Sequence, residues 1–352
     1  MNRFHYIRPA SIAEAVAAAA QPGSALLAAG TNLLDLMKVG VARPRRLVDI
    51  SHLAGLDSIE WLSDGGVRIG SLVRNSDLAY DERFTRSFPA VAEALLSGAS
   101  AQLRNAATVG GNLMQRTRCA YFQDPSSACN RREPSSGCDA REGENRLHAV
   151  LGWSEHCIAT HPSDFCVPLV ALDAVVEVEG PFGPREIAVD ALHPLPGSTP
   201  ERDTALAPGE LIIALRIPGR SAAFSRNARY LKLRERTSYA FAVVSAAAGL
   251  RMEGGVIRAA CIALGGVAPK PWRAGEAEVS LVGMQPTAEA FAKAAKLALA
   301  EACPSGDNAF KIELARRIVI RALALAAEGT PQIMPALPAS PFSTVPGASH
   351  AA

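Results

Sequence analysis

Residues 102–113 read QLRNAATVGGNL, which places Gly110 and Gly111 between Thr108 and Asn112. Glycine has no Cβ and tolerates a wide range of φ, so a backbone of this composition can approach a phosphate group closely. The hydroxyl and amide side chains beside the glycines suit the same task. This stretch therefore predicts a turn that holds an anion through its backbone.

A second glycine turn lies near the N-terminus. Residues 25–29 form a small and apolar run of strand length, Gly30-Thr31-Asn32 follows, and residues 33–38 have a helical pattern. Free amides and the positive end of the helix dipole at such a junction make an anion site. An ordinary strand-to-helix turn of an α/β sheet explains the same pattern, so both interpretations stay open on this feature alone.

The composition favours a globular protein that acts on small molecules. The chain has 352 residues, of which 49% are hydrophobic and 20% charged, and this length allows two or three domains. The formal net charge of +2 indicates no strong field for nucleic acid. The N-terminus lacks the apolar segment of a signal peptide, so we expect a soluble chain without an export signal of its own and without a membrane span.

Hydrophobic patterns divide the chain into an α/β part, a β-rich part and an α+β part. Ser11 and Glu14 have the spacing of a capping box, which predicts a helix start at residue 12. The predicted strands are 4–7, 25–29, 47–50, a hairpin of 59–62 with 67–70, 187–189, 210–217, and a three-stranded C-terminal sheet of 230–234, 242–251 and 257–264. The predicted helices are 12–20, 33–38, 76–80, 90–96, 287–302 and 310–327, and residues 167–178 pass from helix or strand into strand.

Four of the seven cysteines fall in one polar segment. Cys119, Cys129, Cys138 and Cys157 are separated by nine, eight and eighteen residues. Zinc knuckles and ribbons usually place two ligands within two to four residues, so this spacing disfavours a structural zinc without excluding it. Iron–sulfur clusters accept long loops between thiolates, and a long polar loop needs something to order it. We therefore favour one [4Fe-4S] cluster on these four thiols over reduced structural cysteines.

The other three cysteines, Cys166, Cys261 and Cys303, sit in apolar runs, and we expect them to be buried in the core. Cys166 is the alternative to Cys157 as the fourth ligand of the cluster, but its apolar neighbours favour the core.

At these motifs the chain resembles the FAD-binding subunits of the molybdenum hydroxylases, the group of the xanthine dehydrogenase and carbon monoxide dehydrogenase flavoproteins. The resemblance extends to about Ala327, and residues 102–113 carry its more specific motif. It implies a first pyrophosphate loop and a second one, with a carboxylate for FAD hydroxyls and two positions that line or close the flavin site. The implied cofactor contacts are Leu26, Leu27, Ala28, Ala29, Gly30, Thr31, Asn32 and Leu33, then Thr108, Gly110, Gly111 and Asn112, then Asp164, and finally Ile213 and Lys232.

The cysteine segment limits the resemblance to one subset of the family. In most of the family a short turn separates Asn112 from Ser163, whereas here the cysteines fill that gap. This is similar to the subset whose flavin subunit carries an additional [4Fe-4S] cluster, which includes the periplasmic aldehyde oxidoreductases and the 4-hydroxybenzoyl-CoA reductases. The residues around the four cysteines look closest to the aldehyde oxidoreductase type. Some relatives place an aromatic residue against the flavin before the second loop, and the matching position here is Gly98.

The resemblance implies an α+β fold in two domains. The first is a two-lobed α/β FAD-binding domain of the PCMH type at residues 1–222, with lobes 1–52 and 53–222 and an iron–sulfur insertion at 115–162. The second, at 223–330, is a three-stranded sheet with helices, of the CO dehydrogenase flavoprotein C-terminal type. Residues 331–352, rich in Pro, Ser and Ala, form an extended tail in this interpretation.

The implied function is that of an electron-transfer subunit, with FAD and a [4Fe-4S] cluster, in a heterotrimeric molybdenum-containing aldehyde oxidoreductase. A large partner would hold the molybdenum cofactor and a small partner the [2Fe-2S] clusters, while FAD would pass electrons to an external acceptor. No residue of this chain would act as acid or base on the aldehyde. The resemblance also implies co-export to the periplasm with a signal-bearing partner, a cytoplasmic location being the alternative.

Two other functions remain open from the sequence. One is the beta subunit of a 4-hydroxybenzoyl-CoA reductase-like enzyme, in which electrons flow the other way. The other is a zinc-stabilised scaffold subunit that binds no flavin.

Overall fold

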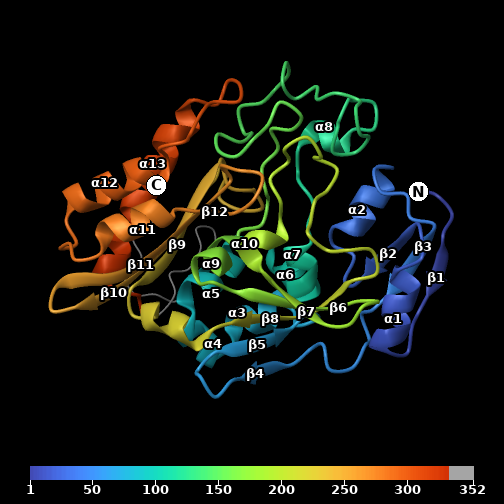
Figure 1. Cartoon of the computed structure of the whole chain (residues 1–352), viewed down its shortest axis with the longest axis horizontal. Helices are drawn as coiled ribbons and strands as arrows, with labels where there is room; N and C mark the ends of the chain where they lie inside the picture. The colour runs from blue at the N-terminus through green and yellow to red at the C-terminus, as the bar shows by residue number, and fades with distance from the viewer. Residues whose placement is uncertain (333–352) are drawn as a thin grey trace.

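A computed structural model describes residues 1–332 and shows three sheets with helices packed around them (Figure 1). The N-terminal sheet is parallel, in the order β1-β3-β2. Its elements are β1 (His5–Ile7), α1 (Ile12–Ala19), β2 (Ser24–Leu27), α2 (Leu33–Lys38) and β3 (Arg46–Asp49). The predicted cap of α1 is present, since the Ser11 hydroxyl accepts a hydrogen bond from the Glu14 amide at 3.2 Å.

The middle sheet is antiparallel, in the order β4-β5-β8-β6-β7, and the predicted hairpin forms its β4-β5 edge. Its strands are β4 (Ile59–Trp61), β5 (Val67–Gly70), β6 (Val175–Glu179), β7 (Arg185–Ala188) and β8 (Leu211–Ile217). The helices around it are α3 (Asn75–Tyr80), α4 (Glu82–Ser87), α5 (Pro89–Ser97), α6 (Ala101–Ala106), α7 (Val109–Leu113), α9 (Cys166–Ala171) and α10 (Val189–Leu192). The second glycine turn is thus the start of a short helix, α7, which the sequence did not predict.

The C-terminal sheet has four antiparallel strands rather than the three expected, in the order β12-β11-β10-β9. The fourth is a two-residue strand that pairs with the end of β11 and is too short to give an alternating pattern. The elements are η1 (Gly219–Phe224), β9 (Ala228–Leu233), β10 (Val244–Glu253), β11 (Val256–Gly265), β12 (Trp272–Arg273), α11 (Gly275–Leu281), α12 (Ala288–Ala298) and α13 (Phe310–Glu328).

This sheet is covered on both faces. Residues Val244 to Leu250 of β10 are all buried, because alternate side chains enter two different cores. Ala247 packs with the α5 and α9 residues of the middle core, whereas Ala246 and Ala248 pack with α11, α12 and α13. The sheet therefore joins the middle of the chain to the C-terminal helices.

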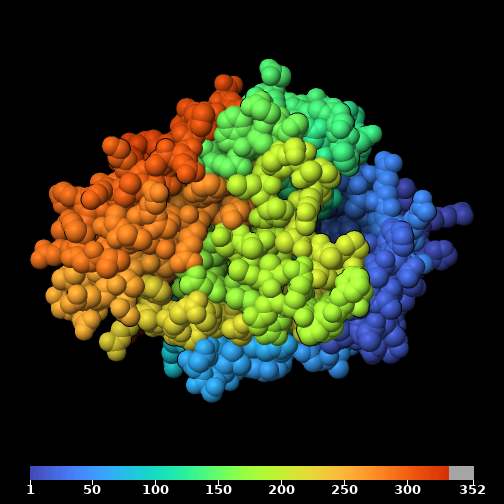
Figure 2. Space-filling view, viewed as in Figure 1, coloured from blue at the N-terminus to red at the C-terminus, as the bar shows by residue number. Residues whose placement is uncertain are grey.

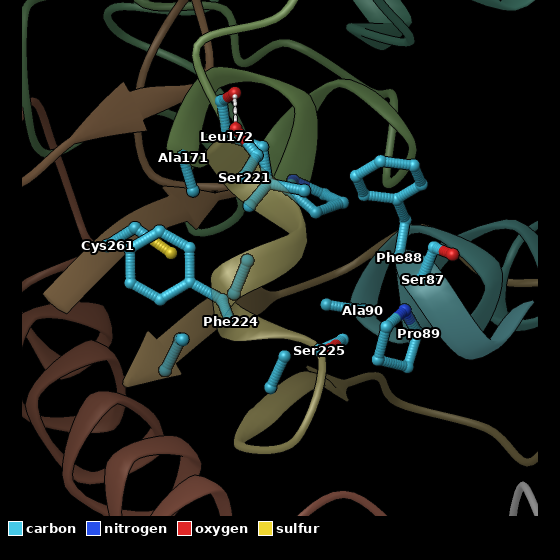
Figure 3. Close-up of a pocket in the computed structure, with 15 residues that line it drawn as sticks. Ser87, Phe88, Pro89, Ala90, Ala171, Leu172, Ser221, Phe224, Ser225 and Cys261 are labelled. Carbon is cyan, nitrogen blue, oxygen red and sulfur yellow. Dashed lines mark hydrogen bonds between the residues drawn. The ribbon is translucent and has the colours of Figure 1, made fainter. Parts of the chain in front are cut away.

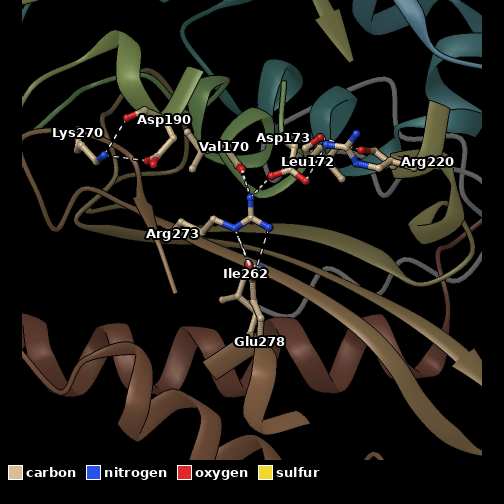
Figure 4. A network of polar contacts seen from close by, with 10 residues as sticks. Val170, Leu172, Asp173, Asp190, Arg220, Ile262, Lys270, Arg273 and Glu278 are labelled. Carbon is tan, nitrogen blue, oxygen red and sulfur yellow. Dashed lines mark hydrogen bonds and ion pairs between the residues drawn. The ribbon is translucent and has the colours of Figure 1, made fainter. Parts of the chain in front are cut away.

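Ion pairs stabilise the contact between the middle part of the chain and the C-terminal sheet (Figure 4). The Arg273 guanidinium pairs with Glu278 at 3.1 Å and with Asp173, which follows α9, and Lys270 pairs with Asp190 at 2.8 Å. Asp173 and Asp190 belong to the middle part of the chain, so the pairs that they form cross the predicted boundary at residue 222.

The apolar pocket in Figure 3 lies at the same junction, beside Phe88, Phe224 and Cys261. Its lining is mostly apolar and contains neither a charged side chain nor a group of metal ligands, so we interpret it as a packing gap.

The cysteine segment forms an edge of the molecule with little regular structure beyond α8 (Ala120–Gln123). In Figure 2 it lies, in green, between the N-terminal region in blue and the C-terminal helices in orange and red. Cys166 and Cys261 are buried as predicted, whereas Cys303 is exposed, so its assignment to the core was wrong. Cys303 comes after the end of α12, where its main chain bonds back to Val150 and its side chain faces solvent.

None of the helices within residues 1–332 combines the length and the apolar character that crossing a membrane requires. The predicted tail at 331–352 lies almost entirely outside the described residues, which end at 332.

Candidate functional site

A cleft of about 910 Å³ lies where the N-terminal turn, α7, the cysteine segment and the C-terminal sheet meet. This volume is in the range of small-molecule and cofactor sites. Of the cofactor contacts expected from the sequence, six line its wall: Thr31, Asn32, Gly111, Asn112, Asp164 and Lys232. These residues are up to 201 positions apart in the chain, so packing and not sequence proximity brings them together.

The first turn presents polar atoms to the cleft. Gly30 has a φ of +75°, and a Cβ there would lie 2.7 Å from the Leu34 side chain, so only glycine fits. The Asn32 side-chain oxygen accepts a hydrogen bond from the Arg116 amide at 3.0 Å. The Asn32 Nδ2 is buried without a partner among the described residues, which leaves a free donor at the cleft.

The two glycines of the second turn have different surroundings. The Gly110 amide donates to the Ser71 carbonyl at 2.8 Å, and a Cβ on Gly110 would lie 2.9 Å from the Ser71 Cβ, so this glycine allows close packing. Gly111 faces the cleft, and a Cβ there would approach only the Thr108 hydroxyl, at 3.1 Å. The Ser163 hydroxyl donates to the Asn112 side-chain oxygen at 2.8 Å and so joins this turn to Asp164.

Asp164 lines the cleft, and its carboxylate accepts hydrogen bonds from two side chains. The Tyr230 hydroxyl donates to its Oδ1 at 2.6 Å and the Lys232 ammonium to its Oδ2 at 2.7 Å. The two charged side chains are 9% and 3% exposed, and Lys232 also donates to the Ser97 carbonyl at 3.1 Å. Burial, together with the Asp164 charge, holds the pKa of Tyr230 well above its ordinary value, so the phenol remains a donor. A carboxylate has about four acceptor directions, so Asp164 can still accept from a ligand.

The four cysteines of the insertion line one further cavity, together with Arg131. Cys129 and Cys138 face each other in an isolated antiparallel bridge, and the Asn130 side chain accepts from the Gly137 amide at 2.8 Å. Burial, with neighbouring thiols adding to it, raises the pKa of Cys119 to about 11 and also raises that of Cys138. The thiols of Cys119 and Cys138 are therefore poor anions unless a cation joins them.

Backbone and guanidinium donors surround these sulfurs. The backbone amides of Tyr121 and Phe122 act against the rise in the pKa of Cys119, and those of Ala140 and Ile158 act against the rise in the pKa of Cys138. Arg131 is buried, yet its contacts with Cys157 and Asp203 raise its pKa above the ordinary value. Donors of this kind stabilise thiolate ligands, and the positive charge of Arg131 offsets the negative charge of the thiolates.

Two family models match almost the whole chain. Residues 2–220 match the FAD binding domain in molybdopterin dehydrogenase, and residues 229–326 match the CO dehydrogenase flavoprotein C-terminal domain. The chain belongs to the FAD-binding subunits of the molybdenum hydroxylases. It is thus an oxidoreductase subunit, and the predicted α+β fold class is confirmed.

Individual relatives agree with this assignment. The aldehyde oxidoreductase FAD-binding subunit PaoB of Escherichia coli is 48% identical over 328 residues, which covers 92% of this chain and 98% of the relative. The carbon monoxide dehydrogenase medium chain of Hydrogenophaga pseudoflava is 29% identical, over 91% and 96% of the two chains. A solved CO dehydrogenase from Oligotropha carboxidovorans superposes with a TM-score of 0.73 at 27% identity, over 94% and 99% of the two chains.

The remaining expected contacts of this FAD-binding subunit lie beside the cleft wall. Leu26, Ala28 and Ile213 pack on the N-terminal core, and Thr108 caps α7. Leu27, Ala29, Gly30, Leu33 and Gly110 are likewise absent from the wall.

The sequence did not single out several polar and aromatic residues that line the cleft of this subunit. The basic ones are Arg104, Arg118, Arg146 and Arg236, and the aromatic ones include Tyr239 and Phe241. The Arg118 Nε is buried and has no partner within residues 1–332. Gly98 also lines the cleft, so the aromatic rings in its wall come from other positions, namely Phe165, Tyr239 and Phe241. Two of the arginines had a local signal in the sequence, since Arg104 lies in the 102–113 motif and Arg118 precedes Cys119.

A second group of potential metal ligands is His161, Cys166 and His193, whose ligand atoms lie within 4.8 Å of one another. The Ser163 amide donates to the His161 Nδ1 at 3.3 Å, which leaves the proton of a neutral ring on Nε2. Burial lowers the pKa of both histidines, that of His193 to about 4, and the nearby Arg131 charge contributes. The protonated nitrogen and the positive neighbour oppose a cation, so we interpret this group as a neutral polar cluster.

Proposed function

We propose that this subunit passes electrons within a molybdenum-containing aldehyde oxidoreductase and that it binds both FAD and one [4Fe-4S] cluster. The observation that carries the proposal is the convergence of Cys119, Cys129, Cys138 and Cys157 on one cavity. The similarity to an aldehyde oxidoreductase FAD-binding subunit over nearly the whole chain supports the substrate class.

The cleft residues fit FAD. Its pyrophosphate would lie between the turns that contain Thr31 and Gly111, where the free donor of Asn32 and the unpartnered Nε of Arg118 suit an anion. Asp164 would accept hydrogen bonds from FAD hydroxyls. Lys232 holds the Asp164 carboxylate in place, and Tyr239 or Phe241 offers an aromatic face to the ring system. The full set of expected contacts, from Leu26 to Leu33 and including Thr108, Gly110 and Ile213, stays part of this proposal.

The cysteine cavity fits an iron–sulfur cluster. Its four thiols match the ligand count of a [4Fe-4S] cluster, and nearby backbone amides favour the thiolate form of Cys119 and Cys138. Once bound, FAD and the cluster supply one- and two-electron chemistry, which side chains alone cannot provide. The protein orients the cofactors, and Arg131 compensates the negative charge of the thiolates.

The partners in this proposal are a large subunit with the molybdenum cofactor and a small subunit with [2Fe-2S] clusters. The aldehyde would be oxidised in the large subunit, and electrons would leave through FAD to an external acceptor. We assign no acid–base residue of this chain to the aldehyde. We also propose periplasmic location by co-export, which cell fractionation tests: a chain found only in the cytoplasm while its molybdenum partner is exported would refute it.

Two variants test the cluster in the anaerobically purified complex. Cys157→Ser should remove the iron and sulfide of the [4Fe-4S] cluster, because it replaces one thiolate ligand by a poor one. Cys166→Ala is the matched control, since Cys166 is buried in the core and does not line the cysteine cavity. Iron kept in the first variant and lost in the second would mean that Cys166 is the ligand. Stoichiometric zinc in the wild type would overturn the cluster and favour a zinc-stabilised scaffold.

A further inference from the structure

Cys119 lies in the wall between the two cofactor cavities. It lines the cysteine cavity together with the other three thiols, and it also lines the large cleft. Cys129, Cys138 and Cys157 line only the first of these. Of the four sulfurs, that of Cys119 therefore belongs to the side of the cysteine cavity that adjoins the cleft.

His148 contacts this sulfur from the cleft side. Its Nε2 lies 3.2 Å from the Cys119 Sγ, and the residue is 8% exposed and lines the cleft. A thiolate bound to iron has only acceptor capacity, so the ring nitrogen must donate. The Nδ1 of His148 is buried without a partner in the described part of the chain, which allows it to be the unprotonated nitrogen.

The C-terminal domain holds His148 in this position. Lys311 of α13 is fully buried, and its ammonium donates to the carbonyls of Leu147 at 2.9 Å, His148 at 2.7 Å and Gly266 at 2.6 Å. The Asn308 side chain also donates to the His148 carbonyl, at 3.2 Å. Three donors on an ammonium match three carbonyls, so the backbone at residue 148 has little freedom to move its ring away from Cys119.

We propose that His148 is a positioning residue that donates a hydrogen bond from Nε2 to the Cys119 thiolate and thereby raises the reduction potential of the cluster on its flavin-facing side. The inference rests on the proposed function, because it needs the cluster. Hydrogen bonds to ligand sulfurs are among the factors that set iron–sulfur potentials, since they stabilise the more negative, reduced state. With a cluster bound, the His148 hydrogen bond would make the cluster a better electron acceptor.

The test is a redox titration of the purified complex, with the cluster followed by electron paramagnetic resonance. His148→Met removes the donor and should lower the midpoint potential, by roughly a tenfold change in the reduced-to-oxidised ratio, or about 59 mV for a one-electron couple. His148→Gln is the matched variant, because its amide can still donate, and it should keep the midpoint near the wild-type value.

The outcomes separate the inference from the proposed function. A wild-type complex without a [4Fe-4S] signal would overturn both. A wild-type signal with an unchanged midpoint in His148→Met would overturn the inference alone. If His148→Met loses the cluster while His148→Gln keeps it at the wild-type midpoint, the requirement for a donor is supported. If both variants keep the cluster and the midpoint of His148→Gln is as low as that of His148→Met, the requirement for a donor is contradicted.

Discussion

The ion pair between Asp164 and Lys232 allows stability and FAD affinity to be measured separately. Both side chains are nearly buried, with Nζ and Oδ2 2.7 Å apart. Asp164→Asn removes the negative charge and keeps the shape of the side chain. Lys232 would then be a buried cation whose remaining acceptor is the Ser97 carbonyl.

The expected loss of stability follows from that environment. Breaking a buried pair by removing one charge typically costs about 3–5 kcal/mol, because the other charge is left uncompensated. Lys232 keeps one carbonyl acceptor and Tyr230 can still donate to Oδ1, so we expect the lower end, about 3 kcal/mol. Adding Lys232→Met removes the uncompensated cation, so the double variant should be more stable than Asp164→Asn alone.

FAD affinity should behave differently. If Asp164 accepts from FAD hydroxyls, loss of a charged acceptor costs about 1.5–3 kcal/mol, or roughly ten- to a hundredfold in affinity. The second substitution cannot restore that acceptor. Urea unfolding of the flavin-free protein, followed by circular dichroism, measures the stability, and FAD release on dilution, followed by flavin fluorescence, measures the affinity.

Two results would refute this reasoning. Wild-type FAD affinity in the double variant would show that Asp164 does not bind the cofactor. A double variant less stable than Asp164→Asn would show that the ion pair is not the reason for the loss.

The other predictions concern a glycine and a histidine. Gly111→Val should abolish flavin binding with little change in the urea midpoint, because the valine side chain would enter the cleft. Gly110→Ala should mainly destabilise the fold, because its Cβ would meet Ser71. Full flavin occupancy in Gly111→Val would contradict the assignment of the second loop to FAD binding. The pKa of His193 is lowered by burial from 6.5 to about 4, so the unfolded chain binds a proton between these values that the folded chain does not. The stability is therefore complete above pH 6.5 and falls below it, by about 2 kcal/mol at pH 5 from this residue. His193→Gln should flatten the dependence of the urea midpoint on pH between 8 and 5, and an unchanged slope would argue against a neutral buried His193.

The sequence by itself predicts those parts of the protein whose signal is local. The cap of α1, the β4-β5 hairpin and helices α12 and α13 follow from patterns within a few residues, and all four are present. The glycine turns and the group of four cysteines were also visible, because backbone freedom and thiol chemistry belong to the residues themselves.

Only the tertiary structure decides which of these residues meet. Asp164 pairs with Lys232 across 68 positions of sequence, and no periodic pattern connects them. Cys303 has an apolar neighbourhood in sequence but lies at the surface, while β10 lacks alternation because it separates two cores. The position of His148 beside Cys119 depends on Lys311, 163 residues further along the chain. Hydrophobic periodicity reports which side of one element is buried, whereas a site depends on how several elements pack, and that is a property of the whole chain.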